Sequence, residues 1–339
     1  MRIAIFGAGS LGTILGAYLS EGGIAVDLIS RNREHIWALQ KKGATIIGKR
    51  SATIPVAAMV PESIHGTYDL IFLLTKQLEN EQVAQFLKPF LAEDGMLCTM
   101  QNGIPEPHLM EILGENRVSG CTIGWGATLV APGVVQLTSD ESTFSFNLGL
   151  PVPGEESWLA RISSILSVMG SVTIEKNFMG ARWSKLLINA SFSGTATLLG
   201  CTFGDVAANK KARRIAQLII KECIDVAEAS SITLEPVQGK VIRSLFDYHT
   251  PFKQWISFSL IPFAIRKHRT LKPSMLQDIE KGKPCEVDAI NGVISEQGRK
   301  VAIPTPVNDR VVSLIHSIEN GDAHVGWQHL QAMTAIIER

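Results

Sequence analysis

The chain has no excess of charge of either sign. Lys and Arg total 32 and Asp and Glu also total 32, so the formal net charge at pH 7 is zero. Proteins that bind nucleic acid or anionic membranes usually carry a basic field, and this composition does not supply one. We therefore expect neither nucleic acid nor a membrane among its partners.

Cysteine is sparse and irregularly placed. The five cysteines show no C-x-x-C pair, and they lie at Cys98, Cys121, Cys201, Cys223 and Cys285. Such spacing favours neither a disulfide framework nor a zinc cage. We expect a protein of the reducing cytoplasm that holds no metal.

Long hydrophobic runs are missing as well. The apolar segment at residues 256–265 is short and contains Ser257, Ser259 and Pro262, and no uninterrupted run reaches about 18 apolar residues. The apolar N-terminus is broken by four glycines before residue 19, which argues against a signal peptide. With 45% hydrophobic and 19% charged residues, the composition is that of a soluble globular protein.

The length of 339 residues suggests two domains, and the sequence changes character near residue 176. Before that point, short apolar runs alternate with amphipathic stretches, which is typical of βαβ units around a largely parallel sheet. After it, segments with a 3.6-residue period dominate. We predict an α/β domain over residues 1–176 and a mainly α-helical domain over 177–339.

The expected elements follow from these patterns. In the first domain we predict strands at 2–6, 25–29, 70–74, 96–100, 118–129, 134–137, 143–148 and 172–175, a hairpin or extra strand within 43–59, and a helix at 155–167. In the second we predict helices at 181–199, 210–229, 237–248, 274–281, 286–300 and 308–319.

The most specific motif is a glycine-rich turn. The first predicted strand is followed at once by Gly7-Ala8-Gly9-Ser10-Leu11-Gly12, which opens an amphipathic helix. In this context G-x-G-x-x-G is typical of a Rossmann-type domain that binds the pyrophosphate of a dinucleotide. Gly7 permits the tight turn, Gly9 lets backbone N–H groups approach phosphate, and Gly12 lets the helix pack on the strand. The alternative is a glycine-rich turn without a ligand.

The end of the second strand bears on which dinucleotide binds. An acidic residue there would contact the ribose of NAD, whereas a basic residue accommodates the extra phosphate of NADP. The strand ends in Ile29-Ser30-Arg31, and Asp27 lies inside it. We therefore predict NADPH, with Arg31 on the phosphate; alternatively, Arg31 is a solvated surface charge.

Two loops follow strand ends, where ligands of open α/β sheets bind. Lys76 follows the strand at 70–74 and could reach the cofactor or an anionic substrate. Asn102, in Met100-Gln101-Asn102-Gly103, could hydrogen-bond the nicotinamide end or the substrate. Their structural alternatives are a solvated lysine and a common Asn-Gly turn.

Polar residues also recur in the helical half. Lys185, Asn189 and Ser193 are spaced i, i+4, i+8 and share one face of the predicted helix at 181–199. A lysine aimed at a cleft can act as a general acid, although it can also be a snorkelling side chain. Further on, Ser274 and Gln277 fit a capping box and Glu286 fits a first-turn acid, so spacing alone favours structural roles for both.

In this order, the motifs resemble those of the ketopantoate reductase family (2-dehydropantoate 2-reductases). The similarity covers nearly the whole chain and rests on Gly7 to Gly12, Arg31, Lys76, Gln101-Asn102-Gly103, Trp183-x-Lys185-Leu186 with Asn189, Ser274-Met275-Leu276-Gln277-Asp278, Glu286-Val287-Asp288 with Asn291-Gly292, and Thr305-Pro306-Val307-Asn308.

The resemblance implies NADPH-dependent reduction of the 2-oxo acid ketopantoate to D-pantoate, on the route to pantothenate and coenzyme A. It implies that Lys185 is the general acid, that Glu286 supports this lysine or the substrate hydroxyl, and that Asn189 and Ser274 hold the substrate. Lys76 and Asn102 would lie near cofactor and substrate. We also place Glu286 beside the cofactor, with NADPH on the first domain and substrate in a cleft between the domains.

The chain departs from the family pattern at two positions. Ser193 stands where the family commonly has a second asparagine, and Phe203 stands where it has another. Serine offers fewer donors than an amide and phenylalanine offers none. We keep Ser193 as a substrate contact, and the alternatives are a related NADPH-dependent reductase of another 2-oxo acid or a non-catalytic NADP(H) sensor. The apolar helical faces leave a homodimer open.

Overall fold

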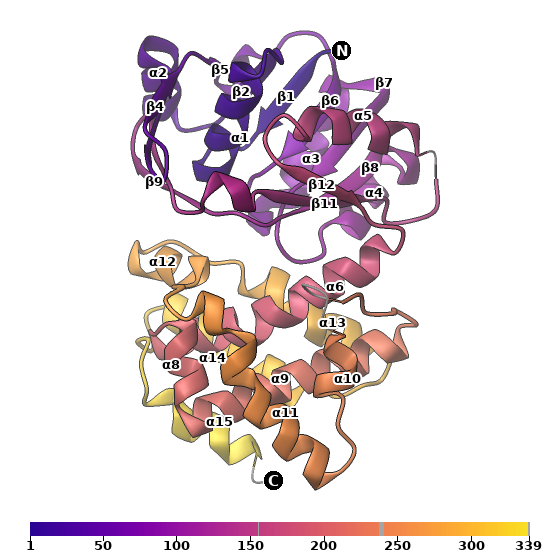
Figure 1. The fold of residues 1–339 in the computed structure, drawn as a ribbon, viewed down its shortest axis with the longest axis vertical. Helices are drawn as coiled ribbons and strands as arrows, with labels where there is room; N and C mark the ends of the chain where they lie inside the picture. The colour runs from indigo at the N-terminus through magenta and orange to yellow at the C-terminus, as the bar shows by residue number, and fades with distance from the viewer. Residues whose placement is uncertain (155, 237–240, 338–339) are drawn as a thin grey trace. The chain divides into compact units, whose positions relative to one another are not determined.

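The computed structural model describes residues 1–154, 156–236 and 241–337 (Figure 1). It divides into two compact units, one made of Met1–Gln101 with Pro105–Phe178 and the other of Asn102–Ile104 with Met179–Arg339. The short segment Asn102–Ile104 thus groups with the second unit, although it follows a strand of the first. The first four residues of the helix expected at 237–248 lie outside the described residues.

The first unit is built on an eight-stranded sheet in the order β12-β11-β8-β7-β6-β1-β2-β5. Every neighbouring pair is parallel except β8 with β11. The strands are β1 (Ile3–Phe6), β2 (Val26–Ile29), β5 (Ala57–Met59), β6 (Tyr68–Leu73), β7 (Leu91–Thr99), β8 (Val118–Ile123), β11 (Ser145–Gly149) and β12 (Ser171–Ile174).

Both faces of this sheet are buried, as its apolar strands require. Along β1, Ile3 and Ile5 enter one core while Ala4 and Phe6 enter another. Helices α1 and α5 pack into the first core and helices α3 and α4 into the second. The fold is therefore the expected α/β Rossmann type, and its helices are α1 (Ser10–Glu21), α2 (Arg33–Lys42), α3 (Asn80–Leu87), α4 (Glu106–Leu113) and α5 (Ser157–Leu166).

A second, four-stranded sheet packs on the side of α1, in the order β4-β3-β10-β9. Its strands are β3 (Ala44–Gly48), β4 (Ala52–Ile54), β9 (Ala127–Ala131) and β10 (Val134–Leu137). The expectation of a hairpin or one extra strand within 43–59 was incomplete. That segment forms three strands, and β5 joins the large sheet beside β2.

A buried histidine ties this small sheet to the helices. His35 on α2 is fully buried; its Nδ1 accepts a hydrogen bond from the Gly133 N–H at 3.0 Å, and its Nε2 lies 2.9 Å from the hydroxyl of Thr13 on α1. Because Nδ1 accepts, Nε2 carries the proton and donates to Thr13, so the ring is neutral. Burial lowers the pKa of His35 below its usual 6.5.

The second unit is a helical domain organised around the long helix α9 (Lys210–Ala229), whose buried residues form the centre of its core. The helices around it include α6 (Phe178–Ile188), α7 (Thr195–Leu199), α8 (Phe203–Ala208), α10 (Ile242–Phe246), α11 (Pro251–Ala264), α12 (Ser274–Glu280), α13 (Val293–Lys300), α14 (Pro306–Glu319) and α15 (His329–Ile337). This confirms the mainly α-helical C-terminal domain.

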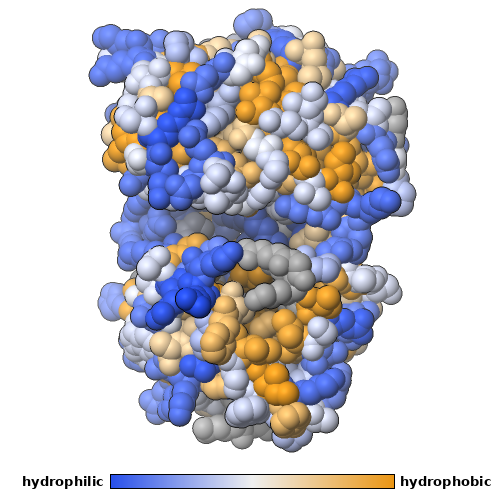
Figure 2. Space-filling view, viewed as in Figure 1, coloured by the Kyte–Doolittle hydropathy of each residue, from blue (hydrophilic) through white to orange (hydrophobic). Residues whose placement is uncertain are grey.

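Two of the expected helices are interrupted by π-helical turns. The helix predicted at 181–199 is α6 and α7 joined by the π-helix η6 (Asn189–Gly194), and the helix predicted at 286–300 begins with the π-helix η8 (Asp288–Gly292). Helices α8, α11 and α15 were not among the helices expected from the sequence. Helix α11 leaves Phe252, Trp255 and Phe263 largely exposed, and Figure 2 shows hydrophobic residues in the region where Figure 1 places it.

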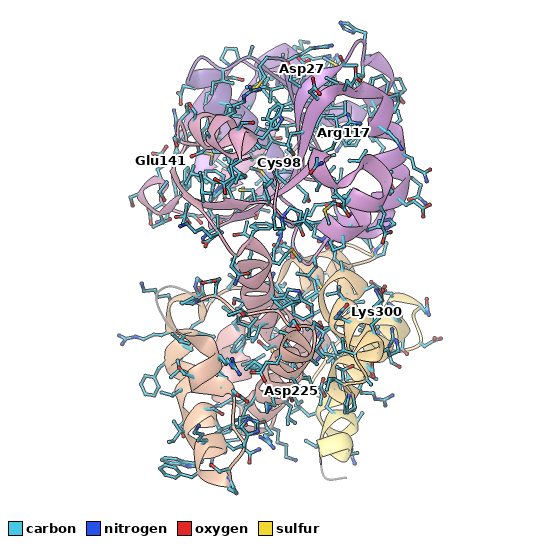
Figure 3. All side chains as sticks on the ribbon, turned by 90° about the vertical axis from the view of Figure 1, so that its right-hand side faces the viewer. Asp27, Cys98, Arg117, Glu141, Asp225 and Lys300 are labelled. Carbon is cyan, nitrogen blue, oxygen red and sulfur yellow. The ribbon has the colours of Figure 1, made fainter. Side chains whose placement is uncertain are left out.

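Among the described residues, no helix has both the length and the hydrophobicity to cross a membrane. All five cysteines are described; each is buried and none forms a disulfide, and Figure 3 labels Cys98 within the first unit. Burial raises the pKa of Cys201 to about 12, so its thiol stays protonated at neutral pH.

We predict that His35→Leu destabilises the protein by about 1–3 kcal/mol at pH 7.5, because the Gly133 N–H and the Thr13 hydroxyl lose their partner. The unfolded histidine, with its higher pKa, takes up a proton first as pH falls below about 6.5, so wild type loses this stability at low pH. Denaturant unfolding of both proteins from pH 7.5 to 5.5 should show the difference shrinking. A constant difference would contradict a neutral His35.

Candidate active site

The glycine turn has the geometry that the sequence predicted. Gly7 has φ +105°, and a Cβ on it would lie 2.5 Å from the backbone nitrogen of Thr75. A Cβ on Gly12 would lie 2.4 Å from the carbonyl oxygen of Gly7. Both glycines are therefore required by the close packing of the turn against α1 and the loop after β6.

Gly9 is different, because a Cβ there would meet nothing within 4 Å. No contact within the protein requires this glycine. Gly9 is the N-cap of α1, where no side chain satisfies the first N–H groups of the helix. An open backbone surface at a helix N-terminus fits a pyrophosphate, so the residues present suit the predicted cofactor.

Arg31 lies just past the end of β2, where the ribose of a dinucleotide is expected. It is exposed and its Nη1 lies 2.5 Å from Oε2 of Glu79, which ends the 3₁₀ helix η2 (Gln77–Glu79). Asp27 is engaged elsewhere, since its Oδ2 accepts a hydrogen bond from the Tyr68 hydroxyl at 2.8 Å. Arg31, not Asp27, thus lies just past the end of β2, where the ribose is expected.

The loops carrying Lys76 and Asn102 are connected by a buried glutamine that the sequence analysis left without a role. Gln101 donates from Nε2 to the Thr75 carbonyl at 2.9 Å and to Asn80 Oδ1 at 2.6 Å. Its Oε1 accepts from Thr99 Oγ1 at 3.0 Å. Glutamine is mostly exposed in proteins, so the burial of Gln101 immediately before Asn102 and Gly103 is a feature that only the fold reveals.

Lys76 itself is exposed at the start of η2, and Asn102 is partly buried. Gly103 has φ +75°, and the backbone bends at Asn102 and Gly103. This bend is compatible with the predicted contact of Asn102 with cofactor or substrate, because Asn102 stays partly exposed.

The predicted stripe of Lys185, Asn189 and Ser193 lies on α6 and η6, and all three side chains are partly exposed between buried neighbours. In an α-helix, residue i+4 lies about 40° past a full turn. A π-helix needs more than four residues for a full turn, so residue i+4 does not yet complete the turn. In ideal geometry, a π-turn thus rotates Ser193 back toward the helix face that carries Lys185, whereas an α-turn would rotate it further away.

A buried polar chain holds this π-helix in place. Asn291, on η8, donates from Nδ2 to the Ala190 carbonyl at 3.2 Å and to Asn308 Oδ1 at 2.9 Å. Asn308 donates from Nδ2 to Glu222 Oε2 at 2.7 Å, and the N–H groups of Val307 and Asn308 also bind this carboxylate. Burial raises the pKa of Glu222 to about 7 although these three donors favour its charged form.

Helix α12 and the π-helix η8 both pack against η6, which brings the remaining predicted residues of the second unit to this region. Ser274 is exposed at the first residue of α12, and Glu286 is partly exposed two residues before η8. The capping-box interpretation of Ser274 was wrong, because the N-cap is Pro273 and no side chain caps this helix. Asp288, not Glu286, is the acid in the first turn.

Phe203, one of the two departures from the family pattern, belongs to the core. It is buried, and its ring centroid lies 5.5 Å from that of Phe192 on η6. Phe203 thus makes an apolar contact with the segment that carries Asn189 and Ser193. Ser193 itself remains partly exposed.

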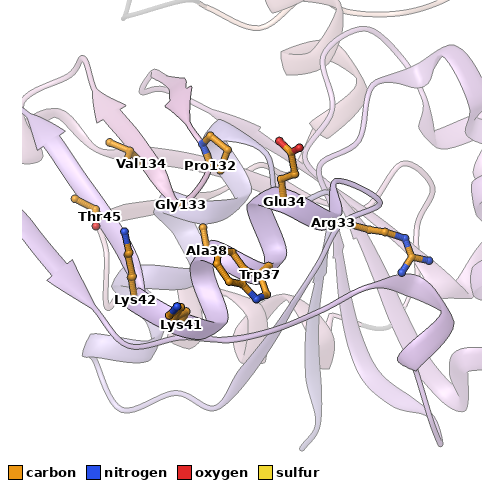
Figure 4. Close-up of a pocket in the computed structure, with 11 residues that line it drawn as sticks. Arg33, Glu34, Trp37, Ala38, Lys41, Lys42, Thr45, Pro132, Gly133 and Val134 are labelled. Carbon is orange, nitrogen blue, oxygen red and sulfur yellow. The ribbon is translucent and has the colours of Figure 1, made fainter.

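One groove of the first unit does not coincide with the predicted site. It has a volume of about 780 Å³ and lies between α2 and the turn that joins β9 to β10 (Figure 4). Its walls include Lys41 and Trp37, whose ammonium group and ring are 4.8 Å apart, but none of the predicted cofactor residues.

A Rossmann-type unit with a G-x-G-x-x-G turn, joined in one chain to a helical unit, is an architecture found in nicotinamide-dependent oxidoreductases. Two family models match the chain, "Ketopantoate reductase PanE/ApbA" over residues 3–148 and "Ketopantoate reductase PanE/ApbA C terminal" over residues 177–319. The chain belongs to the ketopantoate reductase family, whose members are oxidoreductases acting on CH–OH groups.

Individual relatives agree with this assignment. The 2-dehydropantoate 2-reductase of Pyrococcus horikoshii is 30% identical and that of Lactococcus lactis is 29% identical; both matches cover 94% of this chain and 98% of the relative. Among solved structures, a D-mandelate dehydrogenase with NADH and anilino(oxo)acetate superposes with a TM-score of 0.81 at 24% identity, covering 95% of this chain and 99% of that one.

We predict that Gly9→Ala and Gly12→Ala have opposite consequences. Gly9→Ala should leave the melting temperature unchanged but raise the Kd of nicotinamide cofactor about tenfold or more, because its methyl group occupies the surface left for phosphate. Gly12→Ala should lower the melting temperature through its clash with Gly7. Thermal unfolding and fluorescence titration with NADPH and NADH measure both. Unchanged cofactor binding in Gly9→Ala would contradict the assigned phosphate site.

Proposed function

We propose that this protein catalyses NADPH-dependent reduction of ketopantoate to D-pantoate, and that it does so in the cytoplasm. In this proposal the first unit, through Gly7 to Gly12, Arg31 and Lys76, binds the cofactor. The second unit, through Lys185, Asn189, Ser193, Ser274 and Glu286, binds and protonates the substrate, and Asn102 contacts both ligands. A homodimer stays a prediction.

The observation that carries the proposal is the arrangement around η6. Lys185 is partly exposed on a helix whose other faces are buried, and the π-turn keeps Asn189 and Ser193 on its side. Contacts of η6 with α12 and η8 bring two further polar segments to it. A cation among hydrogen-bonding side chains suits a 2-oxo acid, which has a carboxylate to hold and a carbonyl oxygen to protonate.

The chemistry assigns a role to each side chain. The reduced nicotinamide supplies a hydride to the carbonyl carbon when it is bound. Negative charge then develops on the carbonyl oxygen, and the Lys185 ammonium polarises this oxygen and donates a proton to it. Glu286 orients the lysine or accepts a hydrogen bond from the new hydroxyl. Asn189, Ser193 and Ser274 hold the carboxylate and hydroxyl groups of the substrate.

A second candidate is reduction of a different 2-oxo acid, with a bulkier or less polar side chain. Phe203 and Ser193 favour it, since they replace amide groups that could bind a hydroxyl of the substrate. The similarity to a D-mandelate dehydrogenase structure points to an aromatic 2-oxo acid as the first one to test. A non-catalytic NADP(H) sensor is disfavoured, because Lys185 and Glu286 are both present.

The substrate is tested by following NADPH absorbance with ketopantoate and with phenylglyoxylate. We expect ketopantoate to have the higher kcat/KM, and NADPH to be preferred over NADH. A tenfold or larger preference for phenylglyoxylate would replace the first candidate with the second, because one changed contact at a polar site redirects specificity strongly. No turnover with any 2-oxo acid, together with tight NADPH binding, would favour the sensor.

The proton donor is tested by Lys185→Met, which keeps the aliphatic stem and removes the ammonium. We predict that kcat falls about 10²–10⁴-fold while the Kd of NADPH changes less than about twofold, because the lysine acts mainly when charge develops on the substrate. Lys211→Met, on the exposed surface of α9, is the matched control and should retain wild-type kcat. Wild-type kcat in Lys185→Met would rule out the assigned role.

A further inference from the structure

We propose that Glu79 is a cofactor-specificity residue of this enzyme: its carboxylate competes with the 2′-phosphate of NADPH for Arg31 and offers an acceptor to the ribose hydroxyls of NADH. The inference rests on the proposed function in placing the adenosine ribose beside Arg31. It concerns a side chain that was not among the predicted cofactor contacts.

The topology brings Glu79 to this position. Strands β2 and β6 are the two neighbours of β1, and their last residues, Ile29 and Leu73, both pair in register with Phe6 at the end of β1. The three chain segments that leave these strands are therefore adjacent. One is the glycine turn, the second carries Arg31, and the third runs through Lys76 to Glu79.

The contact is a close ion pair, with 2.5 Å between Arg31 Nη1 and Glu79 Oε2. The side chains are 67% and 50% exposed, so water and salt weaken the attraction and the pair can open. A phosphate dianion accepts two hydrogen bonds from a guanidinium and can replace the carboxylate there. The bound phosphate then lies near the negative charge of Glu79, because the backbone holds Glu79 beside the site. This repulsion weakens the binding of the phosphate.

Glu79 has the opposite effect on the unphosphorylated ribose of NADH. Its 2′-hydroxyl donates a hydrogen bond to a carboxylate, which is the role of the acidic residue that many NAD enzymes have at the end of the second strand. In this chain, the carboxylate comes from the loop after β6 instead. Arg31 alone would favour NADPH strongly. Glu79 reduces that preference because it weakens the binding of NADPH and strengthens the binding of NADH.

The test is Glu79→Gln, which removes the charge and keeps the shape of the side chain. Four ligands are titrated at low ionic strength and without substrate: NADPH, NADH, adenosine 2′,5′-bisphosphate and adenosine 5′-monophosphate. We expect the Kd of the two 2′-phosphorylated ligands to fall about fivefold, as for removal of one repulsive charge several ångströms away. The Kd of the other two should stay constant or rise, and the difference should diminish in about 0.5 M salt.

Glu62→Gln is the matched control, because Glu62 pairs with the exposed Arg33 at 3.0 Å in the same unit. It removes the same charge, and we expect the ratio of the NADH and NADPH Kd values to stay at the wild-type value. An unchanged ratio in Glu79→Gln would overturn the inference, and so would an equal shift in both variants.

These results are separable from those on the proposed function. If wild type reduces ketopantoate but Glu79→Gln leaves the ratio unchanged, only the inference about Glu79 fails. If Glu79→Gln shifts the ratio but ketopantoate is not reduced, the substrate assignment fails and the role of Glu79 stands. If wild type binds neither nicotinamide cofactor, both fail.

Discussion

The carboxylate of Glu222 is the group on which the geometry around the π-turn of the second unit depends. It lies on the central helix α9, and it receives three N–H donors from the start of α14. Through Asn308 and Asn291 this anchor reaches the carbonyl oxygen of Ala190, inside the π-turn that separates Asn189 from Ser193. If one side chain of this hydrogen-bond network were removed, buried polar groups would lose their partners, which costs stability. The network therefore holds four segments together, namely α9, α14, η8 and η6.

This constraint explains why a wide helical turn persists where an α-turn would otherwise form. A π-turn has less favourable hydrogen-bond geometry than an α-turn and survives where other contacts hold it, which is often at functional sites. Here Asn291 binds the Ala190 carbonyl, and a Cβ on Gly194 would lie 2.4 Å from Asn291 Oδ1. Close packing thus fixes the turn that carries Asn189 and Ser193.

Local patterns predicted the Rossmann-type sheet, the glycine turn and the helix at 210–229, because each depends on residues close in sequence. They did not predict the π-turns, since the i, i+4, i+8 spacing of Lys185, Asn189 and Ser193 is equally that of an α-helix. They also left out Gln101, Glu222 and Glu79. These side chains act on partners more than 20 residues away, and only the packing of strands and helices brings such pairs together.

Burial separates the side chains that support the fold from those at which a contact with a ligand can change. The polar chain that reaches the Ala190 carbonyl consists of the buried side chains of Glu222, Asn308 and Asn291, so a substitution within it disturbs the fold. Arg31 and Glu79 are exposed, and Ser193 is partly exposed, so changes there cost the fold little. Exposed positions of this kind can change a ligand contact at little cost to the free energy of unfolding. Phe203 packs against Phe192 inside the π-turn, whereas Ser193 lies partly exposed on that turn, so the two departures from the family pattern affect the core and the surface of the same segment.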